Sequence, residues 1–360
     1  MSQKLVNGIV ADYRPLILNP QSKPDLDTIS ALKSNPATMV RDTLEAQVGE
    51  LIKISNPARV FPVPELRQNI ADFLREHKNY GIWVYYPWRN TLVKILDKDD
   101  FIRVRTSRNR YKITQEEQDL LAQKKVGVIG LSVGQSVSLS LAMERSFGEL
   151  RIADFDTLDL SNMNRIRTGL YNLGLPKAWM VAREIAEIDP FLNVTVFDQG
   201  ITNENMDEFF TFGGNLDLLV EECDSLKIKI SSRLKAKKLG IPVLMDTSDR
   251  GLMDIERFDM EPNRPIFHGL LEKFGKESEL DNVLQDRSRE ILFSILDFED
   301  LSERLQRSMG EIGKTITTWP QTASSVISGG AAAAYYSRLI LLDQDVISKR
   351  FYIDLDLLNK

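Results

Sequence analysis

A regular alternation of short apolar runs and helical patterns constrains the fold of this chain most strongly. VGVIG (126–130) reads as a buried strand, SVSLSLAMERSF (136–147) as a helix and LRIADFD (150–156) as the next strand. Strand, helix and strand at this spacing form a βαβ unit with parallel strands. The alternation continues with helices at 177–189 and 227–239 and strands at 193–198, 216–222 and 241–246. The pattern predicts an α/β fold with a doubly wound, mostly parallel, Rossmann-like sheet.

The regions on either side of this sheet are less regular. Residues 1–110 are predicted to form an N-terminal α/β accessory domain, and residues 111–360 a second domain that holds the sheet. The elements expected in the first domain are a helix at 64–77 and strands at 81–87, 91–96 and 101–106. Beyond Arg250, amphipathic helices are expected around 284–312 and 321–343. Small residues in the last of these favour the core or a dimer surface over a cofactor site.

Charge and cysteine content disfavour several classes of protein. The formal net charge of -6 argues against a general nucleic-acid binder. Cys223 is the only cysteine, which excludes an intramolecular disulfide and a CxxC zinc site and favours a reducing compartment, so we expect a cytoplasmic protein. The N-terminus has no signal-peptide pattern. The apolar stretch at 331–342 contains Arg338 and is too short to span a bilayer.

A glycine turn, GLSVG (130–134), joins the first strand of the sheet to its helix. Small residues there let the backbone approach phosphate groups, and the N-terminus of the helix presents unpaired N–H groups to an anion. Asp154 ends the next strand at the spacing of an acid that binds ribose hydroxyls. Together they favour a nucleotide site. Because Ser132 departs from the GxGxxG pattern, a purely structural turn and a loop acid stay as alternatives.

Polar residues follow this second strand in greater number than a dinucleotide site needs. The stretch ADFDTLDLSNMNR contains Asp156, Ser161, Asn162, Asn164 and Arg165. Lys177 then stands at the start of the next predicted helix, where the helix dipole disfavours a cation. Binding of a triphosphate would explain both charges and amides. The alternative is that Ser161 caps a helix and that Arg165 and Lys177 are solvated surface cations.

This ordered series resembles the ThiF-type adenylyltransferases, relatives of the ubiquitin-activating enzymes. The resemblance covers roughly residues 108–250 and rests on DxDxxxxSNxNR followed by GxxK. GLSVG, EECDS, PVLMDTSDRG, ERFD and PIFHGLL are most similar to ThiF-like modules associated with nitroreductase-like domains, although no nitroreductase domain is evident. The resemblance implies that a homodimer adenylylates a carboxylate with ATP and Mg²⁺. The acceptor would be a peptide C-terminus, an amino acid or a small molecule, and we expect no binding of nucleic acid, membrane or zinc.

The resemblance also assigns roles by position. Asp154 matches the ribose acid, Arg165 and Lys177 match cationic residues that contact ATP and assist catalysis, and Asp224 matches the acid that holds Mg²⁺ near the α-phosphate. The residues expected to bind the nucleotide are Gly130, Ser132, Gly134, Asp154, Asp156, Asn162, Asn164, Arg165 and Lys177. In this chemistry a carboxylate attacks the α-phosphorus, and the cations offset the repulsion between two anions.

Several positions depart from the family pattern or are open in their assignment. The arginine that the family takes from a neighbouring subunit corresponds to Arg110 or Arg108. Where the family usually has an asparagine after the metal-binding acid, this chain has Ser225. Where the family has a downstream arginine, this chain has Lys229. The loop cysteine of a thioester relay is missing, and Cys223 reads as a buried core thiol. The acyl group is therefore expected to pass to an amine, to a thiol of another protein or to a nucleophile within the substrate.

Two more residues and two other functions stay open at this point. Arg250, at the carboxyl ends of the strands, is expected either to orient the acceptor or to pair with Asp249 or Glu256. His268 is either a base or a satisfied structural histidine. An NAD(P)-dependent oxidoreductase could use the same strand, turn and helix, but no catalytic histidine with a supporting acid is evident. A nucleotide-binding scaffold without turnover is the other alternative.

Overall fold

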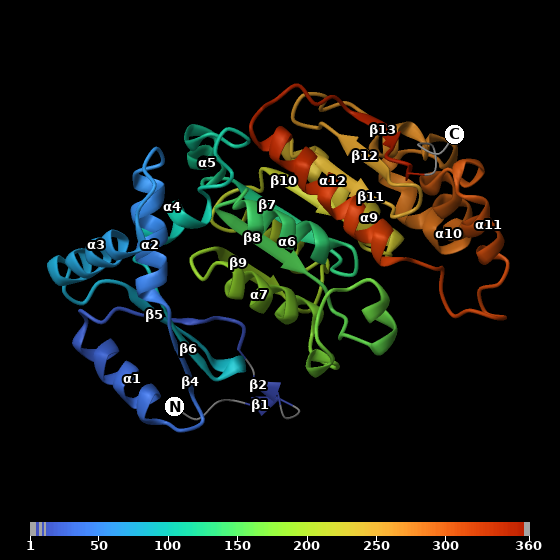
Figure 1. Cartoon of the computed structure of the whole chain (residues 1–360). Coiled ribbons are helices and arrows are strands. Elements are labelled where there is room, and N and C mark those ends of the chain that lie inside the picture. The colour runs from blue at the N-terminus through green and yellow to red at the C-terminus, as the bar shows by residue number, and fades with distance from the viewer. Residues whose placement is uncertain (1–4, 7–8, 11, 356–360) are drawn as a thin grey trace. The chain divides into compact units, whose positions relative to one another are not determined.

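The computed structural model describes residues 5–6, 9–10 and 12–355, and the chain divides into two compact units (Figure 1). The first unit comprises Met1–Glu116 and Ala182–Leu192, and the second comprises Glu117–Val181 and Asn193–Lys360. Grouping of Ala182–Leu192 with the first unit was not expected from the sequence. The predicted α/β class with a mostly parallel sheet is confirmed. Within the described part of the chain, every helix is too short or too polar to traverse a bilayer.

The first unit is built around a four-stranded mixed sheet in the order β3-β5-β6-β4. Its strands are β3 (Leu16–Leu18), β4 (Met39–Asp42), β5 (Ile82–Tyr86) and β6 (Thr91–Ile95), with a short antiparallel pair β1 (Leu5–Val6) and β2 (Ile9–Val10). Its helices are α1 (Lys23–Ser34), α2 (Leu44–Ser55), α3 (Val63–Glu76), η1 (Pro87–Arg89) and α4 (Lys98–Arg105), and α5 (Gln115–Leu121) follows at the junction with the second unit. The helix expected at 64–77 and the strands expected at 81–87 and 91–96 are confirmed.

The strand predicted at 101–106 is wrong, because this segment belongs to helix α4. Phe101 and Val104 stand three residues apart, so in a helix they share one face, and both pack against the cluster that includes Leu44 and Val48 of α2. Asp99 and Asp100 in the first turn also favour a helix, since they complement the positive end of its dipole. The pattern of FIRVRT is compatible with a strand and with a helix. Packing of Phe101 and Val104 against α2 favours the helix.

The second unit contains a seven-stranded sheet in the order β13-β12-β11-β10-β7-β8-β9. Its parallel strands are β7 (Lys125–Ile129), β8 (Glu149–Ala153), β9 (Asn193–Phe197), β10 (Leu218–Glu221) and β11 (Val243–Asp246). Strands β12 (Leu252–Glu256) and β13 (Lys349–Tyr352) each run antiparallel to the neighbour that precedes them along the chain. Every strand and helix predicted between residues 126 and 246 is present, with ends that shift by a few residues.

Helices cover both faces of this sheet and extend beyond it. They are α6 (Gly134–Glu144), α7 (Lys177–Ile188), α8 (Met206–Thr211), α9 (Leu226–Leu239), α10 (Leu280–Leu296), α11 (Glu303–Met309) and α12 (Ala323–Leu341). The short 3₁₀ turns are η2 (Leu160–Asn164), η3 (Leu170–Asn172), η4 (Ile266–Gly269), η5 (Glu272–Phe274), η6 (Glu277–Glu279) and η7 (Phe298–Asp300). The helices expected around 284–312 and 321–343 therefore correspond to α10, α11 and α12.

A tight turn after β11 ends the parallel part of the sheet. Ser248, Arg250 and Gly251 have φ values of 60°, 52° and 63°, which reverse the chain within a few residues. The chain returns as β12, whose residues are all buried. The sequence pattern was irregular here because Asp254 and Glu256 place charged residues within a fully buried strand.

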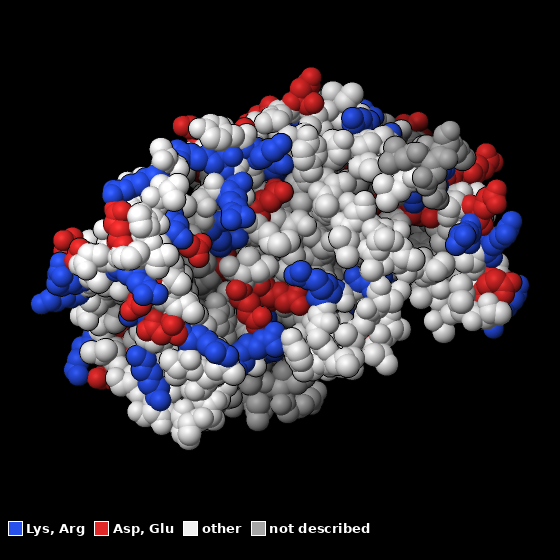
Figure 2. Space-filling view, viewed as in Figure 1, with Lys and Arg blue, Asp and Glu red and all other residues white. Residues whose placement is uncertain are grey.

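Helices α6 and α12 lie side by side on one face of the sheet (Figure 1). A Cβ atom on Gly330 would lie 2.3 Å from Oγ of Ser136 in α6, so the two helices approach closely only because this residue is glycine. The predicted close packing of this small-residue helix is confirmed. Figure 2 shows few charges over these two helices, where Met143, Ile327 and Tyr335 are exposed. Its alternative role as a dimer surface stays a prediction.

Candidate functional site

The glycine turn joins β7 to α6 at the carboxyl edge of the sheet. Gly130 has φ +86°, and a Cβ atom there would lie 2.7 Å from backbone atoms of Glu222 and Cys223, which follow β10. A Cβ atom on Gly134 would lie 2.7 Å from Cγ1 of Val128 in β7. The first glycine therefore lets the turn approach the end of the neighbouring strand, and the second lets α6 begin close to the sheet. Val133, Gly134 and Gln135 at the start of α6 are buried, so an anion would meet the turn at Gly130 and Ser132.

Substitution of Gly130 by alanine tests this close approach. We expect Gly130→Ala to lower the free energy of unfolding by more than the ~1–2 kcal/mol that positive φ costs an alanine, because its Cβ also meets backbone. Gly174→Ala is the matched control, since Gly174 has φ +79° and its added methyl carbon would meet no atom within 4 Å. Urea denaturation of both variants measures the difference. Equal losses would show that the contact with the end of β10 is unimportant.

Asp154 lies directly after β8 and organises the turn. Its Oδ2 accepts a hydrogen bond from the backbone N–H of Leu131 at 2.7 Å, and its Oδ1 accepts one from the N–H of Asp156 at 2.8 Å. The side chain is almost buried, and this burial raises its pKa, while the charge of Lys177 acts in the opposite direction. Asp154 thus has the structural role that the sequence left open. Each of its oxygens keeps a second lone pair, and its role as ribose acid stays a prediction.

Lys177 is the first residue of α7 and joins the turn to the segment after β8. Its Nζ donates hydrogen bonds to Oδ2 of Asp156 at 2.8 Å and to Oγ of Ser132 at 3.3 Å. Lys177 is only 3% exposed, so it is not the solvated surface cation that the sequence allowed as an alternative. The structure therefore brings together the glycine turn, Asp156 and Lys177, as predicted.

Asn162 lies in the 3₁₀ turn η2, which Asp159 caps. Its side-chain oxygen accepts a hydrogen bond from the N–H of Asp159 at 3.0 Å, and the side chain of Asp159 accepts one in return from the N–H of Asn162. This reciprocal pair is a capping box. The alternative that Ser161 caps this turn is wrong, because Asp159 occupies the capping position. The capping bond uses the side-chain oxygen of Asn162 in the turn itself, and its contact with ATP stays a prediction.

Arg165 follows η2 and has an unused donor. Its guanidinium donates to the side chain of Asn164 at 3.0 Å, while its buried Nε has no partner among the described residues. Burial lowers the pKa of Arg165, and the negative charge of Asp224 opposes this effect. Asn164 in turn donates to the carbonyl of Gln321 at 2.7 Å. A buried N–H without a partner is unusual, and an anion beside Asp224 would satisfy it.

Asp224 borders a cavity of 160 Å³ between the ends of β7, β8 and β10. Its carboxylate is exposed and makes no hydrogen bond or ion pair with the described residues. The sequence pattern did not predict that residues 200–201 would line this cavity. The only signal for them was that DQGIT (198–202) stands at the end of a predicted strand. The cavity is lined by residues 129–132, 153–156, 200–201, 222–225 and 228. The glycine turn, Asp154, Asp156 and Asp224 therefore face one space.

Two buried carboxyl groups, Glu222 in the cavity lining and Asp246 at the end of β11, are close to each other. Oε1 of Glu222 accepts a hydrogen bond from the N–H of Asp246 at 3.0 Å, and Oδ1 of Asp246 accepts one from the N–H of Ser248 at 3.0 Å. Burial raises the pKa of Asp246 to about 7, and burial together with the charge of Asp246 raises the pKa of Glu222. The neutral form of Glu222 is therefore favoured more than that of an exposed glutamate. Asp246 is buried at the end of β11.

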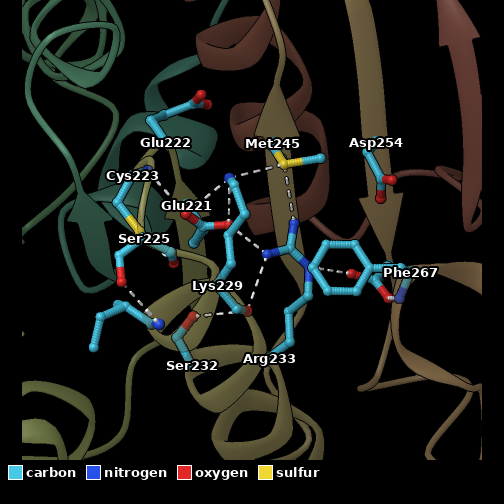
Figure 3. Close-up of polar contacts among 12 residues, drawn as sticks. Glu221, Glu222, Cys223, Ser225, Lys229, Ser232, Arg233, Met245, Asp254 and Phe267 are labelled. Atoms are coloured by element: carbon cyan, nitrogen blue, oxygen red, sulfur yellow. Dashed lines mark hydrogen bonds and ion pairs between the residues drawn. The ribbon is translucent and has the colours of Figure 1, made fainter. Parts of the chain in front are cut away.

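An ionic network anchors the strand end that carries Asp224 (Figure 3). Glu221 accepts hydrogen bonds from Nζ of Lys229 at 3.0 and 3.1 Å and from the guanidinium of Arg233, and these charges overcome burial and hold its pKa below the usual range. Its Oε1 also accepts the N–H of Cys223 at 2.8 Å. Arg233 further donates to Glu256 at 2.8 Å. Lys229 is therefore part of this network. The lysine that stands where the family has an arginine thus helps to hold the strand end that carries Asp224.

Three other side chains singled out in the sequence are also described by the structure. Nε2 of His268 lies 3.0 Å from Oδ1 of Asp254, and Nδ1 lies 2.8 Å from a guanidinium nitrogen of Arg264. The sequence did not reveal these two partners of His268. They favour the alternative that His268 is a satisfied structural histidine. Cys223 is partly buried, and burial raises the pKa of its thiol. Ser225 caps α9, since its hydroxyl accepts the N–H of Ile228 at 3.4 Å.

Arg250 is held away from both ion-pair partners that the sequence suggested. Its Nε donates to Asp354 at 2.7 Å and its Nη1 donates to the carbonyl of Asp300 at 2.5 Å. The predicted pairs with Asp249 or Glu256 are therefore wrong. Asp249 accepts instead from Ser302, and Glu256 from Arg233, because the turn after β11 reverses the chain between them. Arg250 fixes the C-terminal part of this unit.

Arg108 and Arg110 lie between α4 and α5, in the first compact unit. Both side chains are exposed. The structure describes one copy of the chain, so it holds no neighbouring subunit that could receive or supply an arginine. The contribution of Arg110, or Arg108, to the site of another subunit therefore stays a prediction.

Comparison with known proteins gives this site a family. The sequence profile of the ThiF family matches residues 106–308. The chain is 41% identical over 339 residues, or 94% of its length, to protein MT1398 of Mycobacterium tuberculosis, of which it spans only 45%. It is 25% identical over 191 residues to the tRNA threonylcarbamoyladenosine dehydratase of Bacillus subtilis, covering 51% of this chain and 74% of that protein.

A solved structure supports the same fold. MccB of E. coli superposes with a TM-score of 0.51 and 15% identity, covering 86% of this chain and 85% of that chain. The family match spans more than half of the sequence and includes the glycine turn, Lys177 and Asp224. Because the family match spans more than half of its residues, the chain belongs to the ThiF family.

Proposed function

We propose that this protein activates a carboxylate by transfer of the adenylyl group of ATP. The observation that carries the proposal is the grouping of Lys177, Ser132 and Asp156 beside the glycine turn, with Arg165 and Asp224 at the same edge of the sheet. A molybdopterin-synthase adenylyltransferase of Haemophilus influenzae is 24% identical over 159 residues, covering 44% of this chain and 64% of that protein. This relative supports the same reaction type.

In the proposed step, an oxygen of the substrate carboxylate attacks the α-phosphorus of ATP. A new phosphorus–oxygen bond forms, the bond to the β-phosphate oxygen breaks, and pyrophosphate leaves with that electron pair. Two anions must meet, so the site has to supply positive charge. Lys177 and the free Nε of Arg165 supply it near the turn. No proton transfer is needed, which agrees with the structural role of His268.

Asp224 fits the role of a magnesium ligand. Its carboxylate faces the cavity and has no partner among the described residues. Within those residues no group of three His, Cys, Asp or Glu side chains converges. Mg²⁺ is usually held by one or two carboxylates together with substrate phosphates, so the single exposed carboxylate of Asp224 is compatible with this role. The ion would neutralise charge on the phosphates, and Asp224 would orient it.

Exchange of radiolabel between pyrophosphate and ATP tests the proposal. We expect the purified chain to catalyse exchange only when a suitable carboxylic acid is present, and Asp224→Asn to lose it while still folding. The Asn variant keeps the shape of the side chain and removes its charge. Nucleotide binding without exchange for any acid would favour the scaffold, and preferred binding of NAD would favour the oxidoreductase. A homodimer and a nitroreductase-like partner are further proposals, tested by the mass of the protein in solution and by copurification.

A further inference from the structure

A second cavity of 320 Å³ lies at the carboxyl edge of the sheet, beyond the nucleotide cavity. One wall is apolar, and it consists of Leu296, Leu301, Leu305, Trp319 and Pro320. The lining is also polar in part, with hydroxyl groups of Thr247, Ser248, Ser302, Thr322 and Ser325. Helices α10 and α11 and the segment before α12 build most of it. The volume is at the lower end of the range for small-ligand sites, so it suits a group of about one residue in size.

One acid and one cation line this cavity. Asp249 is the one acid in its lining, and its two oxygens accept hydrogen bonds from the hydroxyl and the N–H of Ser302 at 2.7 and 2.8 Å. Arg304 also lines the cavity, is exposed and makes no hydrogen bond or ion pair with the described residues. The acid therefore has its partners within the fold, while the cation has none among the described residues. An anionic ligand complements this combination.

The cavity is joined to the nucleotide site in two ways. Strands β10 and β11 are parallel neighbours, so Thr247 and Asp224, which follow them, emerge at the same edge. Asn164, the neighbour of Arg165, donates to the carbonyl of Gln321, which lines the second cavity. A ligand in this cavity thus lies one strand away from the acid expected to hold the metal.

We infer that this second cavity binds the acyl substrate of the proposed reaction, and that this substrate is a carboxylic acid with an apolar group of about one residue in size. The apolar group would pack against Leu305 and Trp319, and Arg304 would attract the carboxylate toward the site. The inference rests on the proposed function and adds the class of acid. A free apolar acid and the apolar C-terminal residue of a peptide share this chemistry.

Calorimetric titration tests the inference directly. The two probes are 4-phenylbutanoate and the peptide N-acetyl-Gly-Gly-Leu, added with the α,β-methylene analogue of ATP, which cannot release pyrophosphate. At least one probe should bind the wild-type chain, and the probe that binds distinguishes the free acid from the peptide. Acetate and 4-phenylbutanamide should bind much more weakly, since each lacks one half of the required chemistry.

Matched variants locate the binding. Arg304→Gln should raise the Kd of the probe roughly tenfold, and Ser325→Phe, which places a ring in the cavity, by at least as much. Arg307→Gln, on the same helix, and Ser324→Phe, an exposed neighbour, should leave the Kd unchanged because neither residue lines the cavity. Titration of the ATP analogue alone should be the same in all four variants.

The outcomes separate the inference from the proposed function. If neither probe binds, or if Ser325→Phe binds as well as wild type, the inference is overturned even when another acid supports exchange. If a probe binds at this cavity but supports no pyrophosphate exchange, the cavity does not hold the acyl substrate, and the absence of exchange with every other acid then rejects the proposed function as well.

Discussion

Lys177→Ala should lower the rate of pyrophosphate exchange about 10²–10³-fold, the usual effect of removing one charge-stabilising donor from an active site. Lys177 is the buried cation that contacts both the glycine turn, through Ser132, and Asp156. Without it, the negative charge of Asp156 would be uncompensated beside the phosphates. The loss should therefore exceed that from deletion of an exposed charge. Exchange assays at saturating ATP measure the effect.

Lys238→Ala is the control for this variant. Lys238 is an exposed residue in the last turn of α9, so its removal should leave exchange within about twofold of wild type, as expected for a surface substitution. Thermal unfolding of both variants should confirm that each is folded. If Lys177→Ala is folded and exchanges as fast as wild type, this lysine has no part in the reaction.

Arg233→Met should lower the free energy of unfolding by about 3–5 kcal/mol, because it breaks a buried ionic network from one side. The guanidinium has no exposed surface and donates to Glu221 and Glu256, which are also fully buried. Methionine would fill part of the space, but it leaves two carboxyl groups with fewer partners. Urea denaturation followed by circular dichroism measures the loss.

Arg287→Met provides the comparison. Arg287 pairs with Glu290 on the surface of α10, where both side chains are about half exposed, so this substitution should lower the free energy of unfolding much less than Arg233→Met does. Equal losses in the two variants would mean that the buried network is as dispensable as a surface pair. Because Glu221 also fixes the N–H of Cys223, Arg233→Met should in addition weaken nucleotide binding.

The sequence predicted the parallel part of the sheet because its strands are continuous apolar runs between clear helices. It failed where packing overrides local pattern. FIRVRT alternates like a strand, yet Phe101 and Val104 meet the core only as a helix. The buried strand β12 carries Asp254 and Glu256, whose charges made it read as irregular. Their partners Arg233 and His268 come from distant segments, and no local pattern reveals such pairing.

The grouping of Lys177 with Ser132 and Asp156 was predictable, since all three follow from the order of strands and helices in a βαβ unit. The second cavity was not. Its residues come from the turn after β11, from α11 and from the start of α12, which are far apart in sequence. The capping role of Asp159 was also missed, because three polar residues stand within a few positions of it and only the backbone geometry selects among them.

The contact between α12 and α6 has a consequence for how a substrate is received. The start of α12 contributes Thr322 and Ser325 to the second cavity, and further along the same helix Gly330 touches Ser136, two residues after the phosphate turn ends at Gly134. Helix α12 therefore connects the second cavity, where the acyl group would bind, with the glycine turn, where the phosphates would bind. The two reactants would therefore be held at a fixed separation by α12.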